Sequence, residues 1–308
     1  MFPNPRTGKP RHERGMLVIG EGFEMPFGLI EGAKPGPRLI VTAGVHGSEF
    51  CSIEAAQRLL AMTPDDIAGT LVVLPIVNLE AFRKRSIYIV PADGKNLNRV
   101  FPGRADGSAS ERLAHWLVTN AYAQADFYID LHGGDLNEAL VPFVIYPDGD
   151  ERAKQLALLF GLPNVIASQT KGFSISAASA RGVPAILAEV SGNGLWDDEL
   201  VAPLVDGVKR VMQLIGMRAG QVAMPRNPPP VQTLAFISSP VDGLWYPSQG
   251  IAAKVTSDQT LGEVRDLMGR RLVVVKAPTT GTVLFQMTSL SVNAGEALLG
   301  IGSVRSGG

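Results

Sequence analysis

The sequence has a single cysteine, Cys51, among its 308 residues. It therefore cannot form an internal disulfide, which excludes the disulfide-stabilised secreted domains. Long apolar runs are also lacking, since none reaches the ~18 residues needed to cross a bilayer. The first residues contain no apolar core of the signal-peptide kind. Together these absences predict a cytoplasmic protein without a membrane span.

An excess of charge of one sign is lacking as well. The chain has 28 basic and 29 acidic residues, a net charge of −1, so we expect no general attraction to nucleic acid or to anionic membranes. A hydrophobic fraction of 45% is enough for a large core. The length suits one large domain, or a domain of about 200–230 residues with a smaller one attached. The oligomeric state stays open, and a homo-oligomer is compatible with these numbers.

Apolar segments typical of buried strands alternate with segments of helical periodicity over most of the chain. The predicted strands are residues 38–44, 71–77, 125–131 and 183–190, and the predicted helices are 49–62, 111–123, 152–160 and 200–217. Residues 16–30 alternate as an antiparallel hairpin does. This succession predicts an α/β fold with a mostly parallel, mixed sheet flanked by helices on both faces.

A second region begins after a glycine- and proline-rich break at residues 219–231. We therefore divide the chain into a domain at 1–222 and a β-rich domain at 232–308. The latter contains a repeat, because segments starting at Pro240 and Pro278 are 38 residues apart and share the same spacing of Pro, Gly and Leu. The repeat resembles the lipoyl/biotinyl fold. The turn at 265–271 lacks the lysine that such carriers modify, so we do not expect a carrier.

A histidine and a glutamate lie three residues apart in Gly44-Val45-His46-Gly47-Ser48-Glu49, between a predicted strand and a predicted helix. Open α/β sheets bind ligands at such strand ends. Catalytic zinc takes three protein ligands of these types and leaves a fourth position for water. A surface His/Glu pair would give the same pattern, so a third ligand is needed from another strand end.

The segment Asp130-Leu131-His132-Gly133-Gly134 supplies that ligand, because His132 directly follows the predicted buried strand at 125–131. Asp130 points to the same side of a strand and could orient a ligating imidazole. A turn-capping aspartate beside a surface histidine is the alternative interpretation. The other two histidines, His12 and His115, lie in a polar stretch and an amphipathic helix, where a structural role suffices.

Two further segments carry polar groups suited to a substrate. Asn98 and Arg99 combine an amide with a planar guanidinium, which can bind a carboxylate in a bidentate manner, although a solvated basic loop would look similar. Glu189 stands in an apolar strand before a glycine-rich turn. Burial there would cost desolvation and raise its pKa towards that of a general base; a structural capping role is the alternative.

Four of these features, taken in order, resemble the succinylglutamate desuccinylase/aspartoacylase family of the zinc carboxypeptidase clan. They are Gly-x-His-Gly-x-Glu at 44–49, Asn-Leu-Asn-Arg-x-Phe-Pro-Gly at 96–103, Asp-Leu-His at 130–132 and Glu189. The resemblance implies a zinc-carboxypeptidase-like fold and one zinc ion per chain.

The same resemblance implies that His46, Glu49 and His132 are zinc ligands and that Glu189 is the general base. It also implies that Asn98 and Arg99 clamp the substrate carboxylate. Arg85 would polarise the scissile carbonyl, with Arg83 as its alternative. Arg181 is the nearest candidate for a second substrate carboxylate.

The predicted function is zinc-dependent deacylation of a small N-acyl amino acid or related amine, with an acyl group such as acetyl or succinyl. A zinc carboxypeptidase acting on peptides is one alternative, and a non-catalytic, metal-stabilised binding module is another. A serine hydrolase is disfavoured, because the sequence contains no Gly-x-Ser-x-Gly elbow.

Overall fold

The computed structural model describes residues 7–20 and 22–305. Its strands are β1 (Arg11–Val18), β2 (Glu24–Glu31), β3 (Arg38–Thr42), β4 (Thr70–Leu74), β5 (Phe127–His132), β6 (Glu138–Leu140), β7 (Phe143–Pro147), β8 (Asn164–Ser168), β9 (Ala185–Glu189), β10 (Val231–Ser238), β11 (Gly243–Pro247), β12 (Lys254–Val255), β13 (Thr260–Arg265), β14 (Arg271–Lys276), β15 (Gly281–Met287), β16 (Ser291–Val292) and β17 (Ala297–Val304).

The α-helices are α1 (Phe50–Leu59), α2 (Leu79–Lys84), α3 (Ala109–Trp116), α4 (Glu151–Phe160), α5 (Ser174–Ser179) and α6 (Asp198–Leu214). Short 3₁₀ segments occur at Pro64–Asp66, Leu97–Arg99 and Tyr122–Gln124, and a π-helical turn at Leu117–Ala121 extends α3. Within the described residues, the helices are too short or too polar to traverse a bilayer.

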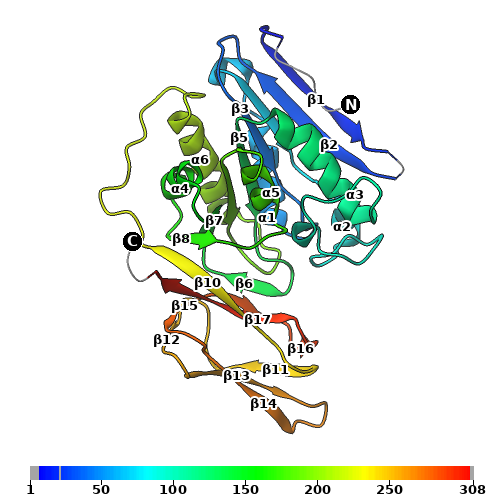
Figure 1. Cartoon of the computed structure of the whole chain (residues 1–308), viewed down its shortest axis with the longest axis vertical. Coiled ribbons are helices and arrows are strands. Elements are labelled where there is room, and N and C mark those ends of the chain that lie inside the picture. Colours follow the sequence, from blue (N-terminus) through cyan, green and yellow to red (C-terminus); the bar gives the residue numbers. More distant parts are fainter. Residues whose placement is uncertain (1–6, 21, 306–308) are drawn as a thin grey trace.

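The centre of the main sheet is parallel, as predicted. Strands β4, β3, β5 and β9 lie side by side in the same direction, whereas β7 runs antiparallel to β9 and parallel to β8. At one edge β1 and β2 form the expected antiparallel hairpin, drawn in blue in Figure 1. The sheet is therefore mixed, and its parallel part brings the carboxyl ends of β3, β5 and β9 to the same edge.

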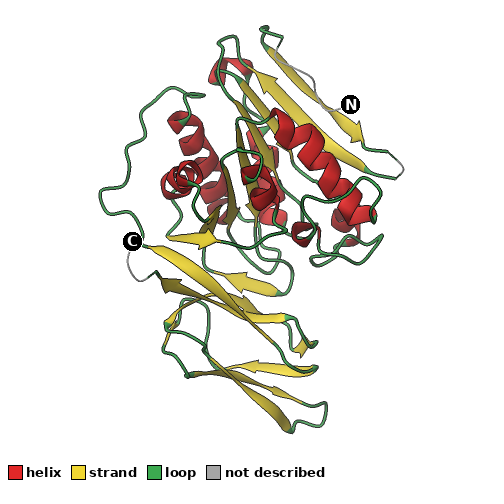
Figure 2. Cartoon of the chain, in the orientation of Figure 1, coloured by secondary structure: helices red, strands yellow, loops and turns green. Residues whose placement is uncertain are grey.

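Helices cover both faces of the sheet, and the alternation of strand residues decides which face each side chain joins. In β3, Leu39 and Val41 belong to the apolar core that contains residues of α1, α4 and α6, whereas Ile40 between them belongs to the core that contains residues of α3 and α5. Successive strand residues point to opposite faces, so a strand buried on both sides is apolar throughout. Figure 2 shows these helices in red around the central strands.

Local chemistry explains where predicted elements begin and end. The predicted helix at 111–123 begins two residues earlier, at Ala109, because Ser108 and Glu111 form a capping box in which the Ser108 N–H donates to Glu111 Oε2 at 2.8 Å. The predicted strand at 71–77 stops at Leu74. Pro75 follows, and proline has no N–H to donate to a sheet.

Strands β7 and β8 were not predicted. Each has five residues, and a short apolar run cannot be assigned to strand or helix by periodicity alone. They extend the sheet beyond β9 and connect it to the C-terminal region, since β8 pairs in parallel with β10.

After a loop at residues 215–230, the described residues to 305 form strands without a helix, as expected for the β-rich region. This region is yellow to red in Figure 1 and lies at one end of the α/β part. It has its own apolar core around Trp245. Among the described residues, two strand pairings join it to the α/β part, because β10 pairs with β8 and β15 pairs with β6.

Strand pairing repeats within the β-rich region. Strands β10 and β11 of the first half correspond to β14 and β15 of the second, and β11 and β15 begin 38 residues apart, at Gly243 and Gly281. Strand β10 pairs with β17 as β14 pairs with β13. Strand β11 pairs with β13 and β16 as β15 pairs with β17 and β12. Each sheet of the region thus combines strands of both halves.

Candidate metal centre and substrate cavity

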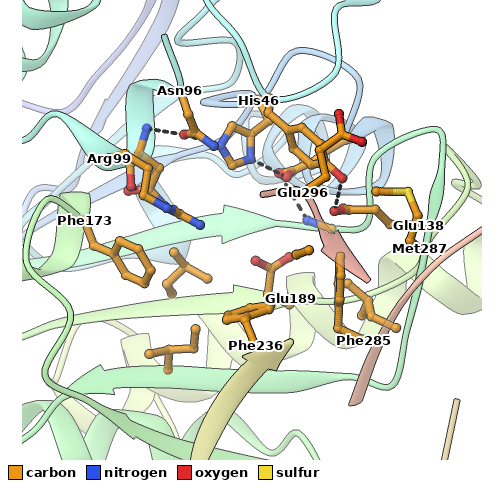
Figure 3. Close-up of a pocket in the computed structure, with 18 of the residues that line it drawn as sticks. His46, Asn96, Arg99, Glu138, Phe173, Glu189, Phe236, Phe285, Met287 and Glu296 are labelled. Carbon is orange, nitrogen blue, oxygen red and sulfur yellow. Dashed lines mark hydrogen bonds and ion pairs between the residues drawn. The ribbon is translucent and has the colours of Figure 1, made fainter. Parts of the chain in front are cut away.

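The chemistry-bearing residues gather at the carboxyl edge of the parallel strands. His46 and Glu49 lie in the loop between β3 and α1, His132 ends β5 and Glu189 ends β9. His132 and Glu189 are direct partners in the register of the two strands. Figure 3 shows His46, Glu189 and Arg99 around one cavity.

Two glycines shape the loop that carries His46 and Glu49. Gly44 has φ 62°, a left-handed conformation that glycine adopts without strain. At Gly47 a Cβ atom would lie 2.2 Å from the backbone nitrogen of Phe82, so only glycine allows the loop to pack on α2. The loop can therefore turn sharply and direct both side chains to one point.

His46, Glu49 and His132 form a compact group of potential metal ligands. One ligand atom from each lies within 4.8 Å of the others, and all three side chains are buried. His46 Nδ1 is 2.6 Å from Glu49 Oε1, and His132 Nδ1 is 2.9 Å from Glu49 Oε2. The structure thus brings together the three residues that the sequence predicted as a set.

The far nitrogen of each imidazole faces a fixed oxygen. His46 Nε2 lies 3.0 Å from Asn96 Oδ1, and His132 Nε2 lies 3.1 Å from Asp130 Oδ2. Because both oxygens are acceptors, each Nε2 can donate its proton there, which leaves Nδ1, on the side of Glu49, as the nitrogen available to a metal ion. The contact predicted for Asp130 is present; that of Asn96 was missed, although Asn96 belongs to the motif at 96–103.

The group fits a zinc ion. Both ring nitrogens of His132 are buried and lack a well-aligned hydrogen bond. A buried polar atom without a partner is costly, and a cation bound by Nδ1 would satisfy it. Two imidazoles and one carboxylate are a donor set found in catalytic zinc sites.

Electrostatics in the group favours a proton or a cation between the three residues. Burial alone would raise the pKa of Glu49, but His132 and His46 lower that pKa to about 2. Burial would lower the pKa of His132, but Glu49 and Asp130 raise it well above the ordinary value. Glu49 therefore remains an anion, and metal binding must displace protons from the imidazoles.

Glu189 and Arg99 line the same cavity as His46. Burial, followed by the charge of Glu49, raises the pKa of Glu189 well above its ordinary value. Arg99 lies over the ring of Phe173, 4.6 Å from its centroid, and donates from Nη1 to the Asn98 carbonyl at 2.9 Å. The guanidinium is thus held at the cavity wall with donors left for a ligand.

The other predicted arginines lie outside this cavity. Arg85 ends α2 in the left-handed region and is exposed, and Arg83 lines a separate hollow with Phe23 and Glu24. Arg181 precedes β9 and lines another hollow with Asp126, at the amino end of the parallel strands. This position corrects the prediction that Arg181 binds a substrate carboxylate, because the metal centre is at the carboxyl end.

The cavity has a volume of about 450 Å³, and its wall is completed by the β-rich region. Phe236 of β10, Phe285 and Met287 of β15, and Glu296 before β17 line it together with the residues of the α/β part (Figure 3). The sequence gives no local signal for these residues. The pairing of β6 with β15 and of β8 with β10 brings them to the same cavity as His46.

Two buried carboxylates beside the metal centre were also missed. Asp135 accepts hydrogen bonds from Ser48 Oγ and from the Tyr88 N–H, and Glu138 accepts one from the Tyr88 hydroxyl. Burial, then Asp135, raises the pKa of Glu138 to about 8. Tyr88 and Glu138 line the cavity, so its wall near the metal centre is acidic.

The family model of the Succinylglutamate desuccinylase/Aspartoacylase catalytic domain matches residues 35–215. The N-alpha-acetyl-L-2,4-diaminobutyric acid deacetylase of Halomonas elongata is 27% identical over 287 residues, which are 87% of this chain and 83% of that protein. The succinylglutamate desuccinylase of Pseudomonas aeruginosa is 30% identical over 161 residues, 46% of each chain.

Solved structures share the fold. The product-bound ectoine utilization protein EutE (DoeB) of Ruegeria pomeroyi matches with a TM-score of 0.85 at 23% identity, covering 98% of both chains. A succinylglutamate desuccinylase/aspartoacylase of Rhodobacter sphaeroides matches with a TM-score of 0.83 at 22% identity, covering 96% of both. Both matches extend over the β-rich region.

Proposed function

Because the chain belongs to the succinylglutamate desuccinylase/aspartoacylase family, we propose that it is a zinc-dependent hydrolase that deacylates a small N-acyl amino acid. Its similarity to a deacetylase and to succinylglutamate desuccinylases identifies it as a hydrolase that acts on amide bonds. The observation that carries the proposal is the group of His46, Glu49 and His132 in one cavity with Glu189 and Arg99.

The residues divide the reaction between them. A zinc ion held by His46, Glu49 and His132 would lower the pKa of a water molecule to roughly 7 and polarise the substrate carbonyl. Glu189 takes a proton from the attacking water and returns it to the departing nitrogen. Its pKa is raised by burial, which brings a carboxylate into the range of an effective general base.

Asn98 and Arg99 hold the carboxylate of the amino-acid part of the substrate. A guanidinium matches the two oxygens of a carboxylate in one plane. The stacking of Arg99 on Phe173 fixes the plane of that guanidinium.

Arg85 remains our candidate for the group that assists the carbonyl. The next residue, Ser86, accepts a hydrogen bond on its carbonyl from Ser48 Oγ at 3.2 Å, and Ser48 precedes the ligand Glu49. The backbone at Arg85 is therefore close to the metal centre, whereas the side chain of Arg83 lines a different hollow.

The charges of the cavity favour a neutral acyl group, such as acetyl. Among the described residues that line it, Arg99 is the one permanently cationic side chain, and Glu138, Glu189 and Glu296 are carboxyl groups. An acyl group with its own carboxylate would be desolvated there without a partner, which costs free energy. Succinyl substrates are accordingly disfavoured.

A substrate panel tests the function. We expect the zinc-loaded protein to hydrolyse N-acetyl amino acids, N-acetyl-L-2,4-diaminobutyrate among them, with kcat/KM at least ~10-fold above that for N-succinyl amino acids, about 1.4 kcal/mol of transition-state free energy. A zinc carboxypeptidase would cleave unmodified peptides instead. A metal-stabilised binding module would bind zinc and hydrolyse neither class, which would contradict the proposal.

The clamp gives a second expected result. Arg99→Lys keeps the positive charge but loses the planar pair of donors, so kcat/KM for an N-acyl amino acid should fall about 10- to 100-fold. The primary carboxamide of the same substrate should be affected much less. Equal losses for the acid and the carboxamide would show that Arg99 does not bind the carboxylate.

We further propose that residues 1–222 form the hydrolase domain and residues 232–308 an accessory domain of the lipoyl/biotinyl type. The repeated strand pairing of the two halves supports this comparison. The described turn between β13 and β14 contains Leu267 and Met268 but no lysine, so we assign this domain no carrier role. Its role is instead to complete the cavity wall with residues such as Phe236 and Phe285 and to limit the substrate to a small molecule. The cytoplasmic location and the oligomeric state stay predictions.

A further inference from the structure

The metal centre and the carboxylate clamp are joined by a continuous set of polar contacts. On one side, Asn96 Oδ1 is 3.0 Å from His46 Nε2 and accepts the backbone N–H of Asn98 at 2.8 Å. A single carbonyl oxygen therefore contacts both a ligand imidazole and the backbone of the clamp.

On the other side, the connection runs through the first residue of α5. Asn98 Oδ1 accepts the backbone N–H of Ser174 at 2.8 Å, and Ser174 Oγ donates to Asp130 Oδ2. The same carboxylate oxygen lies 3.1 Å from His132 Nε2. With the contacts of Glu49 to both imidazoles, the set closes into a ring.

Burial makes this ring stiff. Ser174, Asp130 and His132 are fully buried, and Asn98 is 2% exposed. The second oxygen of Asp130 accepts Thr42 Oγ1 at 2.6 Å, so Asp130 has little freedom to find another donor. Water cannot replace a lost hydrogen bond easily at such a place.

Resting on the proposed function, we propose that Ser174 is a positioning residue that couples the carboxylate clamp to the metal centre. Its hydroxyl fixes Asp130 against His132, and its N–H fixes the side chain of Asn98. A substrate carboxylate that fixes Asn98 therefore also helps to fix His132. A zinc ion that fixes His132 likewise helps to fix Asn98, because such coupling is reciprocal. The consequence is that zinc and a substrate carboxylate strengthen each other's binding.

The test uses zinc alone as the probe in a double-mutant cycle. Zinc affinity is measured by competition with a chelator for the parent, Ser174→Ala, Asn98→Ala and the double variant. Neither residue is a potential zinc ligand in the group described above. We expect each single variant to bind zinc about 10-fold more weakly, the lower end of the effect of losing a direct partner of a ligand imidazole, because both residues act through such a partner. The double variant should be no weaker than the worse single one.

Ser179→Ala is the matched control, because Ser179 lies on the same helix and its hydroxyl also donates to an aspartate, Asp150, at 3.0 Å. Its zinc affinity should equal that of the parent. Melting of the metal-free proteins separates folding from metal binding, since a purely structural role would lower the melting temperature without changing zinc affinity. If Ser174→Ala does not fold, Ser174→Thr, which retains the hydroxyl, should bind zinc as the parent does, and Asn98→Ala still reports on the ring.

Parental zinc affinity in both single variants, or additive losses in the double variant, would overturn the coupling. A different result would contradict the proposed function and not the coupling: the zinc affinities would follow the expected double-mutant cycle, but the parent would hydrolyse no N-acyl amino acid. A parent that hydrolyses them while Ser174→Ala and Asn98→Ala bind zinc normally would retain the function and refute the coupling.

Discussion

Replacement of Glu189 by glutamine is expected to lower kcat/KM by roughly 10²–10⁴-fold, the usual contribution of a positioned general base. Glutamine has nearly the same shape as glutamate but cannot accept the proton. Glu189 is not among the three residues grouped for the metal. Zinc content and melting temperature should therefore stay close to those of the parent.

The pH dependence follows from the raised pKa of Glu189. A general base acts only in its ionised form, so parental activity should rise with pH through the pKa of Glu189, above the range of an ordinary glutamate. The acidic limb of the kcat/KM profile should be absent in Glu189→Gln. The measurement is kcat/KM against pH for both proteins.

Glu296→Gln is the matched control, because Glu296 lines the same cavity and its carboxylate accepts hydrogen bonds from Asn293. The same chemical change there should alter kcat/KM by only a few fold. A metal-loaded, folded Glu189→Gln enzyme with parental activity would rule out the proposed mechanism.

The second large effect is expected for zinc itself. The parent should purify with about one zinc per chain, and His132→Ala should bind zinc more than ~100-fold more weakly, because loss of a ligand exceeds the 10–100-fold effect of losing a ligand's partner. Activity should be lost with the metal. The readouts are metal analysis and chelator competition.

Because His132 is fully buried beside Asp130, its replacement also leaves a carboxylate without its partner. His46→Ala provides an independent variant, since His46 is the most exposed of the three residues at 7%. His115→Ala on α3 is the control and should retain zinc. Full zinc occupancy in both His46→Ala and His132→Ala would remove these residues from the site.

The sequence by itself determined the parts of the site that depend on local backbone. His46 and Glu49 are held by one turn whose glycines allow it, and His132 and Glu189 stand at the ends of short apolar strands. Parallel strands align their carboxyl ends at one edge. Residue order and periodicity were therefore enough to predict that His46, Glu49 and His132 meet, whereas the role of Glu189 beside them was implied by the resemblance to the family.

Only the tertiary structure decided which of the charged residues face the cavity. Arg99 and Arg181 both occupy loops in the sequence, but Arg99 lies at the carboxyl edge of the sheet and Arg181 at the amino edge. Loop residues carry no periodicity that would tell the two edges apart. For the same reason, the sequence did not reveal that the side chain of Arg85 is exposed.

Contacts between distant segments were likewise decided by the tertiary structure. Phe236 and Phe285 line the same cavity as His46 because β10 and β15 pair with strands of the α/β part. Ser174 joins Asn98 to Asp130 because the start of α5 packs against both. Such contacts depend on how side chains pack and satisfy buried hydrogen bonds across the fold, and no local pattern of residues records that.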